Sequence, residues 1–233
     1  MNDHRSFQRF AAWTAMLSAP SAYASVIVLL IAVDYNFDAF SDLRILLVTG
    51  AVGAGFLRWS MWLDMFGYYL LITPLTLVLW RWLKHRDPDR IGLYTLCILA
   101  YVLIGAMGAA ILAAAVPPLM ISYAEDPGQG PIIEVVYFAL MNSVYGGLWN
   151  VLEEFIAGIG WIGIGSFLRK ERNGIGIITM ILGTSCIADS IGVILGLESI
   201  ASIALNIYLF LAPLWALILG INLLRKPAQI GTV

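Results

Sequence analysis

Cysteine and histidine are scarce in this sequence of 233 residues, with two of each. Cys97 and Cys186 cannot provide a disulfide framework, and with His4 and His85 they offer no cluster of the ligands that zinc or haem requires. We therefore expect no metal site and no cofactor. The sequence also lacks a Ser/His or Cys/His arrangement for nucleophilic catalysis, which argues against an enzyme.

Charged residues are few as well, at 12% of the sequence, whereas 61% of the residues are hydrophobic and the mean hydropathy is +0.87. The apolar residues form long uninterrupted runs, a pattern far outside that of soluble domains. This composition indicates a polytopic membrane protein. We expect it to be surrounded by membrane lipids and to have no nucleic-acid partner.

Six runs free of charge are long enough to cross a hydrocarbon core of about 30 Å at about 1.5 Å per residue. The expected spans are 10–33, 59–80, 91–116, 146–168, 174–197 and 199–224. They predict an all-α transmembrane helix bundle that forms one domain over residues 1–233. The first run imitates a signal-peptidase site, but it continues through Val33, which favours an uncleaved first span.

The basic residues divide unequally between the two sides of this arrangement. Of 13 Lys and Arg residues, 11 fall in the breaks on one side, and Arg44 and Arg58 fall on the other. Since cytoplasmic loops carry the excess of Lys and Arg, the pattern predicts that both termini are cytoplasmic.

Two apolar segments do not fit the six spans. Residues 45–57 are too short to cross and are expected to form an interfacial or re-entrant segment. Residues 132–145 are expected to form an outer helix that either lies at the interface or extends the fourth span outward. A seven-span alternative is disfavoured, because it would split the basic residues 6 to 7 and leave only the 14 residues of 155–168 for one crossing.

Four carboxylates interrupt the apolar spans: Asp64, Glu153, Glu154 and Asp189. An ionisable group at the centre of a membrane span costs about 2.5 to 3.5 kcal/mol on insertion scales, so each is a candidate for a functional site. Helical rise places all four in the outer third of the bilayer. If their helices are neighbours, they form one acidic site that is reached from outside. The alternative is that the two glutamates mark the headgroup level and that Asp64 is solvated.

Neutral side chains at similar levels are candidate partners for these acids. Tyr68 lies one turn below Asp64, Asn150 precedes the glutamate pair by three and four positions, and Asn206 lies on the sixth span. Each could form a hydrogen bond with a carboxyl group and help to bind a ligand or a proton.

Prolines within the spans are candidates for helix kinks. Pro74 and Pro213 occupy equivalent places in the segments YLLITPL, from Tyr69, and YLFLAPL, from Tyr208, and Pro20 lies in the first span. Because proline removes a backbone donor, each helix is expected to open one turn earlier, at Leu70 and Leu209 in the two repeated segments.

Three segments carry a resemblance to a known family: LRWSMWLDMFGYYLL (57–71), VYGGLWNVLE (144–153) and NIYLFLAPLWALILGINLLRK (206–226). Through them the chain resembles a family of small bacterial six-span integral membrane proteins described only as domain of unknown function number four-three-eight-six. The resemblance implies six spans, a bacterial origin and the inner membrane. It implies no catalytic residue.

The favoured function is a small transporter or ion-coupled permease with an outward-facing carboxylate site for a proton or a small cation. The alternative is a non-catalytic accessory or structural membrane subunit that packs against a second copy or a membrane partner through glycine-rich faces. The most prominent such face carries Gly158, Gly160, Gly163 and Gly165. A hydrolase or lipid-modifying enzyme that uses only carboxylates is the third alternative.

Overall fold

The computed structural model describes residues 2–36, 42–126, 128–226 and 228, which form helices and short connections without a strand. The α-helices are α1 (Asn2–Ala32), α2 (Leu43–Leu47), α3 (Gly50–Asp64), α4 (Thr73–Leu83), α5 (Pro88–Glu125), α6 (Gly130–Met141), α7 (Glu154–Glu171), α8 (Asn173–Ile194) and α9 (Glu198–Arg225). Two π-helical segments, η2 (Met65–Tyr69) and η4 (Asn142–Glu153), and a 3-10 turn, η3 (Leu70–Ile72), connect some of them. The predicted all-α class is confirmed.

Six continuous helical stretches are long and apolar enough to cross a membrane. They are Arg5–Ala32, Gly50–Leu83, Pro88–Glu125, Gly130–Glu171, Asn173–Ile194 and Glu198–Arg225. Large apolar side chains on their outer faces remain uncovered; Trp13, Leu103 and Phe210 are 61%, 61% and 65% exposed. Six spans of this kind mark a multi-pass membrane protein, as the hydropathy predicted.

The prediction that residues 45–57 form a separate interfacial or re-entrant segment is wrong. Leu43–Leu47 form the short helix α2, but from Gly50 onward the chain already belongs to the second span. Gly50 makes the turn between the two helices with a φ of 62°, a left-handed conformation that glycine adopts without steric cost. The exposed Arg58 does not end the helix, because a charge on an outer face leaves the backbone hydrogen bonds intact.

The second and fourth spans are longer than their predicted bounds of 59–80 and 146–168. The extension expected near 132–145 exists as α6, which continues through η4 into α7 and so lengthens the fourth span. This stretch has 42 residues, which corresponds to about 63 Å and exceeds a hydrocarbon core of about 30 Å. Hydropathy alone misses these ends, because a helix that continues beyond the bilayer no longer has to be free of charge. The third predicted span, 91–116, is also too short, because α5 continues to Glu125, whereas the remaining predicted spans correspond to α1, α8 and α9.

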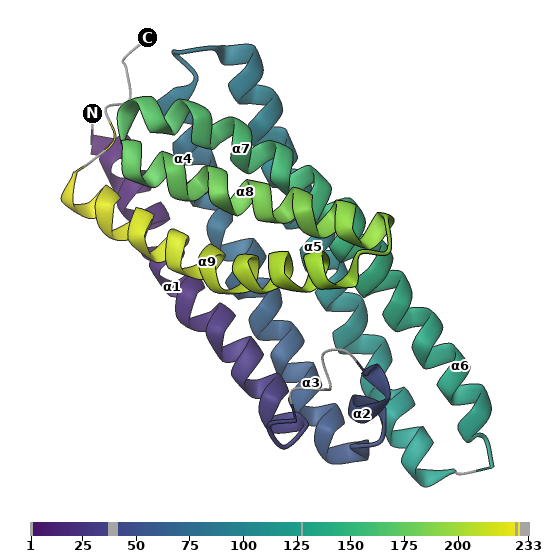
Figure 1. Ribbon diagram of the computed structural model, residues 1–233. Coiled ribbons are helices and arrows are strands. Elements are labelled where there is room, and N and C mark those ends of the chain that lie inside the picture. The colour runs from purple at the N-terminus through teal and green to yellow at the C-terminus, as the bar shows by residue number, and fades with distance from the viewer. Residues whose placement is uncertain (1, 37–41, 127, 227, 229–233) are drawn as a thin grey trace.

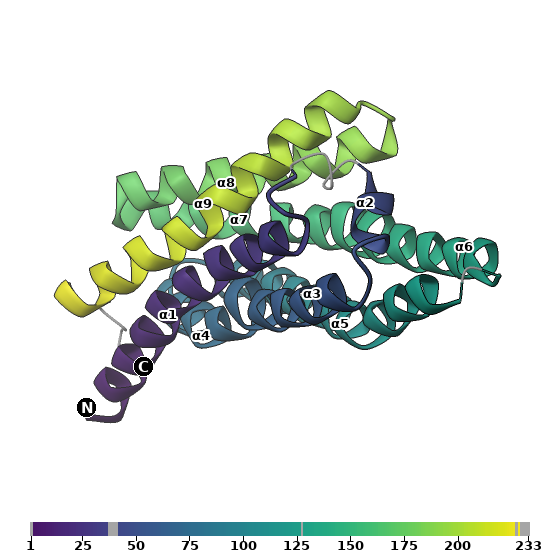
Figure 2. The same cartoon turned by 90° about the horizontal axis from the view of Figure 1, so that it is seen from below.

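The start of α1, the α4–α5 turn, the α7–α8 turn and the end of α9 lie together at one end of the bundle (Figure 1). We call this the basic end, since these segments carry 11 of the 13 Lys and Arg residues. At the opposite, far end, α3, α5 and α6 continue beyond the α8–α9 turn, and α2 lies beside them (Figures 1 and 2). The helices α8 and α9 therefore line only part of the length of the bundle.

Two clusters of buried apolar side chains fill the bundle. The cluster toward the basic end is built by α1, α4, α5, α7, α8 and α9 and contains Trp161. The cluster toward the far end is built mainly by α2, α3, α5 and α6 and contains Tyr137. They meet along α5, where Val102 belongs to the first cluster and Ala109 to the second.

Candidate functional site

Most of the spanning acids lie where the helical geometry changes. Asp64 is the last residue of α3, Glu153 is the last residue of η4, Glu154 is the first residue of α7, and Asp189 lies within α8. Three of the four thus lie where an α-helix meets a π-helical segment. Such segments are rare and occur frequently at functional sites.

Three of these acids are buried within the protein. Glu153, Glu154 and Asp189 have relative exposures of 2%, 3% and 0%, while Asp64 is half-buried. The side chains of the two glutamates are covered by neighbouring helices. Asp64 is partly exposed, and it connects the buried acids with the surface.

The acids follow one another as neighbours across the bundle. Glu153 lies close enough to both Asp64 and Glu154 for direct electrostatic repulsion, and Glu154 stands in the same relation to Asp189. Consecutive helical residues point about 100° apart, so Glu153 faces α3 and η2 while Glu154 faces α8. The pair links the two outer members into one chain, which we call the carboxyl chain: Asp64, Glu153, Glu154 and Asp189.

Few donors reach this chain. Tyr69 lies beside Glu153, and the Cys186 thiol lies beside Glu154. Five carboxyl oxygens remain buried without a hydrogen-bond partner: Oδ2 of Asp64, Oε2 of Glu153, Oε2 of Glu154, and Oδ1 and Oδ2 of Asp189. An unsatisfied buried oxygen is costly, and it costs more when it carries charge.

The nearby hydroxyl groups donate to other acceptors. Tyr68 donates to the Leu209 carbonyl at 2.8 Å, and Tyr101 donates to the Tyr68 carbonyl at 2.9 Å. The hydroxyls of Tyr101 and Tyr208 are 2.6 Å apart. Because the single proton of Tyr101 is directed at a carbonyl, Tyr208 must donate to Tyr101. These three tyrosines therefore have no proton left for a carboxylate.

Basic side chains do not compensate the carboxyl chain. In the described part of the protein the ion pairs are Arg44 with Glu134, Arg86 with Glu171, and Arg90 with Asp87, at 3.2, 2.6 and 3.3 Å. All of them lie outside the level of the four acids. Ionised carboxylates that lie close together in a dry interior repel one another, and a buried charge without a partner is costly.

The predicted neutral partners differ in where they lie. Tyr68 is buried near Asp64, but its proton goes to Leu209. Asn150 is half-buried in η4. Asn206 is exposed and donates to the Ser202 carbonyl of its own helix at 2.8 Å.

The three prolines behave differently. Pro74 lies in the first turn of α4, directly after the π-helical and 3-10 segments that interrupt the second span. Pro20 and Pro213 lie inside helices that continue through them. Pro213 has no N–H to donate to the Leu209 carbonyl. That carbonyl accepts a hydrogen bond from the Tyr68 hydroxyl instead.

Sequence reasoning missed Tyr69, Tyr101 and Cys186. Tyr69 is five residues after Asp64, a separation that points away from Asp64 in an α-helix but returns close to the same face in a π-helix. The repeated segment was the available signal, because its two copies begin with Tyr69 and Tyr208, and both side chains lie beside the carboxyl chain.

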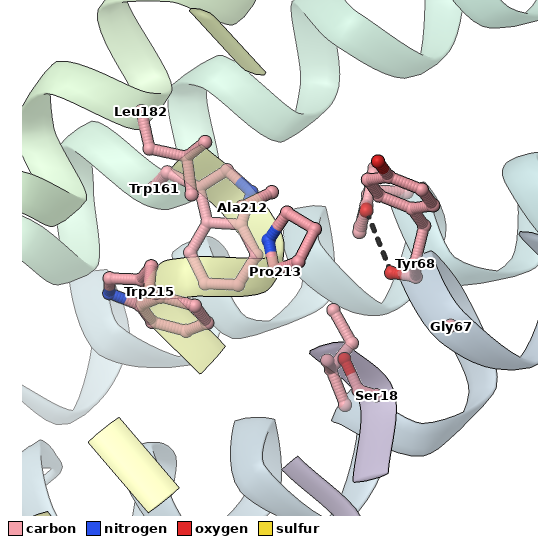
Figure 3. A pocket seen from close by; sticks show the side chains of 10 residues that line it. Ser18, Gly67, Tyr68, Trp161, Leu182, Ala212, Pro213 and Trp215 are labelled. Carbon is pink, nitrogen blue, oxygen red and sulfur yellow. Dashed lines mark hydrogen bonds between the residues drawn. The ribbon is translucent and has the colours of Figure 1, made fainter. Parts of the chain in front are cut away.

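A small cavity borders the tyrosines on the side of the basic end. Its lining includes Tyr68, Tyr101, Trp161, Pro213 and Trp215 (Figure 3). It has room for about one water molecule. The described residues contain no group of three or more His, Cys, Asp or Glu side chains arranged to hold a metal ion. The arrangement can therefore accept protons or water more readily than a larger ligand.

Comparisons with known proteins found no matching family model, no matching curated protein and no matching solved structure. The class of the protein consequently rests on its six spans, and its function has to be argued from the carboxyl chain.

Proposed function

We propose that this membrane protein is a small proton-coupled transporter whose carboxyl chain binds and releases protons. The observation that carries the proposal is the set of five buried carboxyl oxygens without a hydrogen-bond donor and without a basic partner. Intramembrane acids of this kind typically lie on proton or ion pathways.

A proton suits the site better than a metal ion or an organic cation. The carboxyl groups are neighbours in a row and do not surround one point, and the cavity beside Tyr68 and Tyr101 admits about one water molecule. Protonation neutralises a buried carboxylate without requiring space. Four acids that follow one another as neighbours can then share or pass protons between the half-exposed Asp64 and the buried Asp189.

We place this activity in a bacterial inner membrane, as the family resemblance implies, and the charge distribution supports an orientation with both termini in the cytoplasm. The basic end would face the cytoplasm, and Asp64 would lie toward the outside. A homo-oligomer is compatible with this arrangement, since each copy contains a whole carboxyl chain.

The accessory-subunit alternative loses its main feature, because the glycine faces are used within the chain. A Cβ added to Gly158 would lie 2.8 Å from the Gly183 carbonyl, and one added to Gly165 would lie 3.0 Å from the Gly176 carbonyl. These glycines allow α7 and α8 to pack closely against each other. They are not available to a separate partner.

The test is proton flux in proteoliposomes that contain a trapped pH-sensitive dye and are driven by an imposed potential. Asp189→Asn and Glu154→Gln keep the side-chain size but cannot exchange a proton. We expect each to lower flux about tenfold or more. Asp189→Asn should not destabilise the protein through a lost hydrogen bond, since the Asp189 oxygens have no hydrogen-bond partner.

The matched control is Glu125→Gln, which removes an exposed acid at the end of α5. It should leave flux unchanged. Equal flux in wild type, Asp189→Asn and Glu154→Gln, with all three proteins folded, would refute the proposal.

A further inference from the structure

An apolar groove runs between α8 and α9 on the outside of the bundle. Its volume of about 590 Å³ lies within the range of about 300–1,000 Å³ that is typical of small-molecule sites. Aliphatic side chains dominate its walls, including Ile177 and Ile181 of α8 and Ile203 and Ile207 of α9. At 40%, 48%, 63% and 42% exposure, these four side chains present a continuous apolar surface.

The groove ends at a basic residue. Arg169, at the end of α7, is part of its lining. The backbone of Arg169 packs against α8 so closely that a Cβ on Gly176 would lie 2.2 Å from the Arg169 nitrogen. This contact holds the arginine beside the first turn of α8, next to Ile177.

The neighbouring cations are engaged elsewhere. Lys170 lies 5.5 Å from the centre of the Phe167 ring. Arg172 lies 4.6 Å from the centre of the Trp82 ring and also donates to the Lys226 carbonyl. Arg169 is exposed and makes no ion pair or hydrogen bond within the described part of the chain, so its five N–H donors remain available.

We propose that this groove binds an anionic phospholipid, with an acyl chain along the isoleucines and the phosphate at Arg169. The groove is predominantly apolar, with Thr184 and Ser185 as its hydroxyl side chains, and carries the cationic Arg169, which matches the division of charge in such a lipid. A guanidinium group can bind phosphate oxygens through two parallel hydrogen bonds. If the groove bound a second protein helix instead, its lining should have the same character along its whole length.

The test is native mass spectrometry of the full-length protein purified in detergent and titrated with phosphatidylglycerol or phosphatidylcholine of identical chains. The wild type should retain the anionic lipid more strongly. Arg169→Gln should weaken retention of phosphatidylglycerol about fivefold, as expected for one basic residue at a membrane surface. Lys170→Gln removes the same charge one residue further on and should have little effect.

A second pair of variants tests the groove itself. Ile203→Trp should narrow it and weaken phosphatidylglycerol retention, whereas Leu103→Trp, at a position of similar exposure on α5, should not. Equal retention of the two lipids by the wild type, or equal losses in Arg169→Gln and Lys170→Gln, would overturn the proposal. Because the readout is lipid binding, this result does not depend on proton transport.

Discussion

At the scale of single residues, the carboxyl chain depends on the position of Tyr69. This side chain lies beside Glu153 and near Asp64. It occupies the space that a side chain at residue 105 would need, because a Cβ on Gly105 would lie 2.0 Å from Cε1 of Tyr69. Gly105 therefore allows the tyrosine to reach the acids.

Gly105→Ala should displace Tyr69 and destabilise the protein by about 1–3 kcal/mol, the usual cost of overpacking a core. Proton flux should fall as well, since Glu153 loses its hydroxyl neighbour. The loss of stability can be measured by thermal unfolding, with labelling of the buried Cys186 thiol as the probe of unfolding.

Gly92→Ala is the matched control for this prediction, because Gly92 lies in the same helix with nothing within 4 Å of the added Cβ. Its stability should be unchanged or slightly raised, as alanine favours helix over glycine. A Gly105→Ala protein as stable and active as the wild type would contradict the role of this contact.

At the scale of helices, the interruptions of regular α-helix determine which side chains approach the carboxyl chain and which backbone carbonyls can accept a hydrogen bond from a side chain. The interruption at η2 and η3 brings Tyr69 toward Asp64, and η4 ends at Glu153. In α9, Pro213 leaves the Leu209 carbonyl without its usual donor, and Tyr68 of the second span supplies the hydrogen bond. The proline thus couples two helices through one backbone oxygen.

A double-mutant cycle tests this coupling. Tyr68→Phe alone should cost about 1–3 kcal/mol, because the buried Leu209 carbonyl loses its donor. In a Pro213→Ala background the restored N–H can engage that carbonyl, so Tyr68→Phe should cost less. The free energies of unfolding of the four proteins give the coupling energy.

Tyr23 provides the control for the cycle. It donates to the Phe210 carbonyl of the same helix at 2.8 Å, and that carbonyl retains the ordinary donor four residues later. Tyr23→Phe and Pro213→Ala should therefore be additive. Additivity of Tyr68→Phe with Pro213→Ala would show that the proline does not create the acceptor.

At the scale of the whole molecule, the bundle has two unequal parts. The part near the basic end contains all the long helices, whereas α8 and α9 stop before the far end (Figure 1). The 22 residues of α8 correspond to about 33 Å, close to the thickness of a hydrocarbon core. The 38 residues of α5 correspond to about 57 Å, so the far end should project beyond the membrane.

Labelling of intact cells with a membrane-impermeant maleimide tests this orientation. In a protein with Cys97 and Cys186 replaced by alanine, Glu125→Cys at the far end should be labelled from outside. His85→Cys, in the α4–α5 turn at the basic end, should be labelled only after the cells are permeabilised. The reverse pattern would place the basic end outside, contrary to the positive-inside rule.

Much of the fold could be predicted from the sequence, because membrane insertion depends on local apolarity. The length and hydropathy of each run predicted six spans and an all-α bundle, and the cost of buried charge singled out Asp64, Glu153, Glu154 and Asp189. The ends of the second, third and fourth spans were predicted poorly, since helices that leave the bilayer lose the apolar signal. The functional roles of the four acids remain predictions.

The sequence by itself determined that the chain is a helical membrane protein with unusual acids within its spans. Only the tertiary structure decided that these acids are consecutive neighbours, that Tyr69 joins them and that the nearby hydroxyls donate elsewhere. The physical reason is that the hydropathy of a span, and the free-energy cost of an ionisable group within it, are properties of each segment alone. Which oxygen lacks a donor depends on π-helical register, on Gly105 and Pro213, and on the packing of helices distant in the chain.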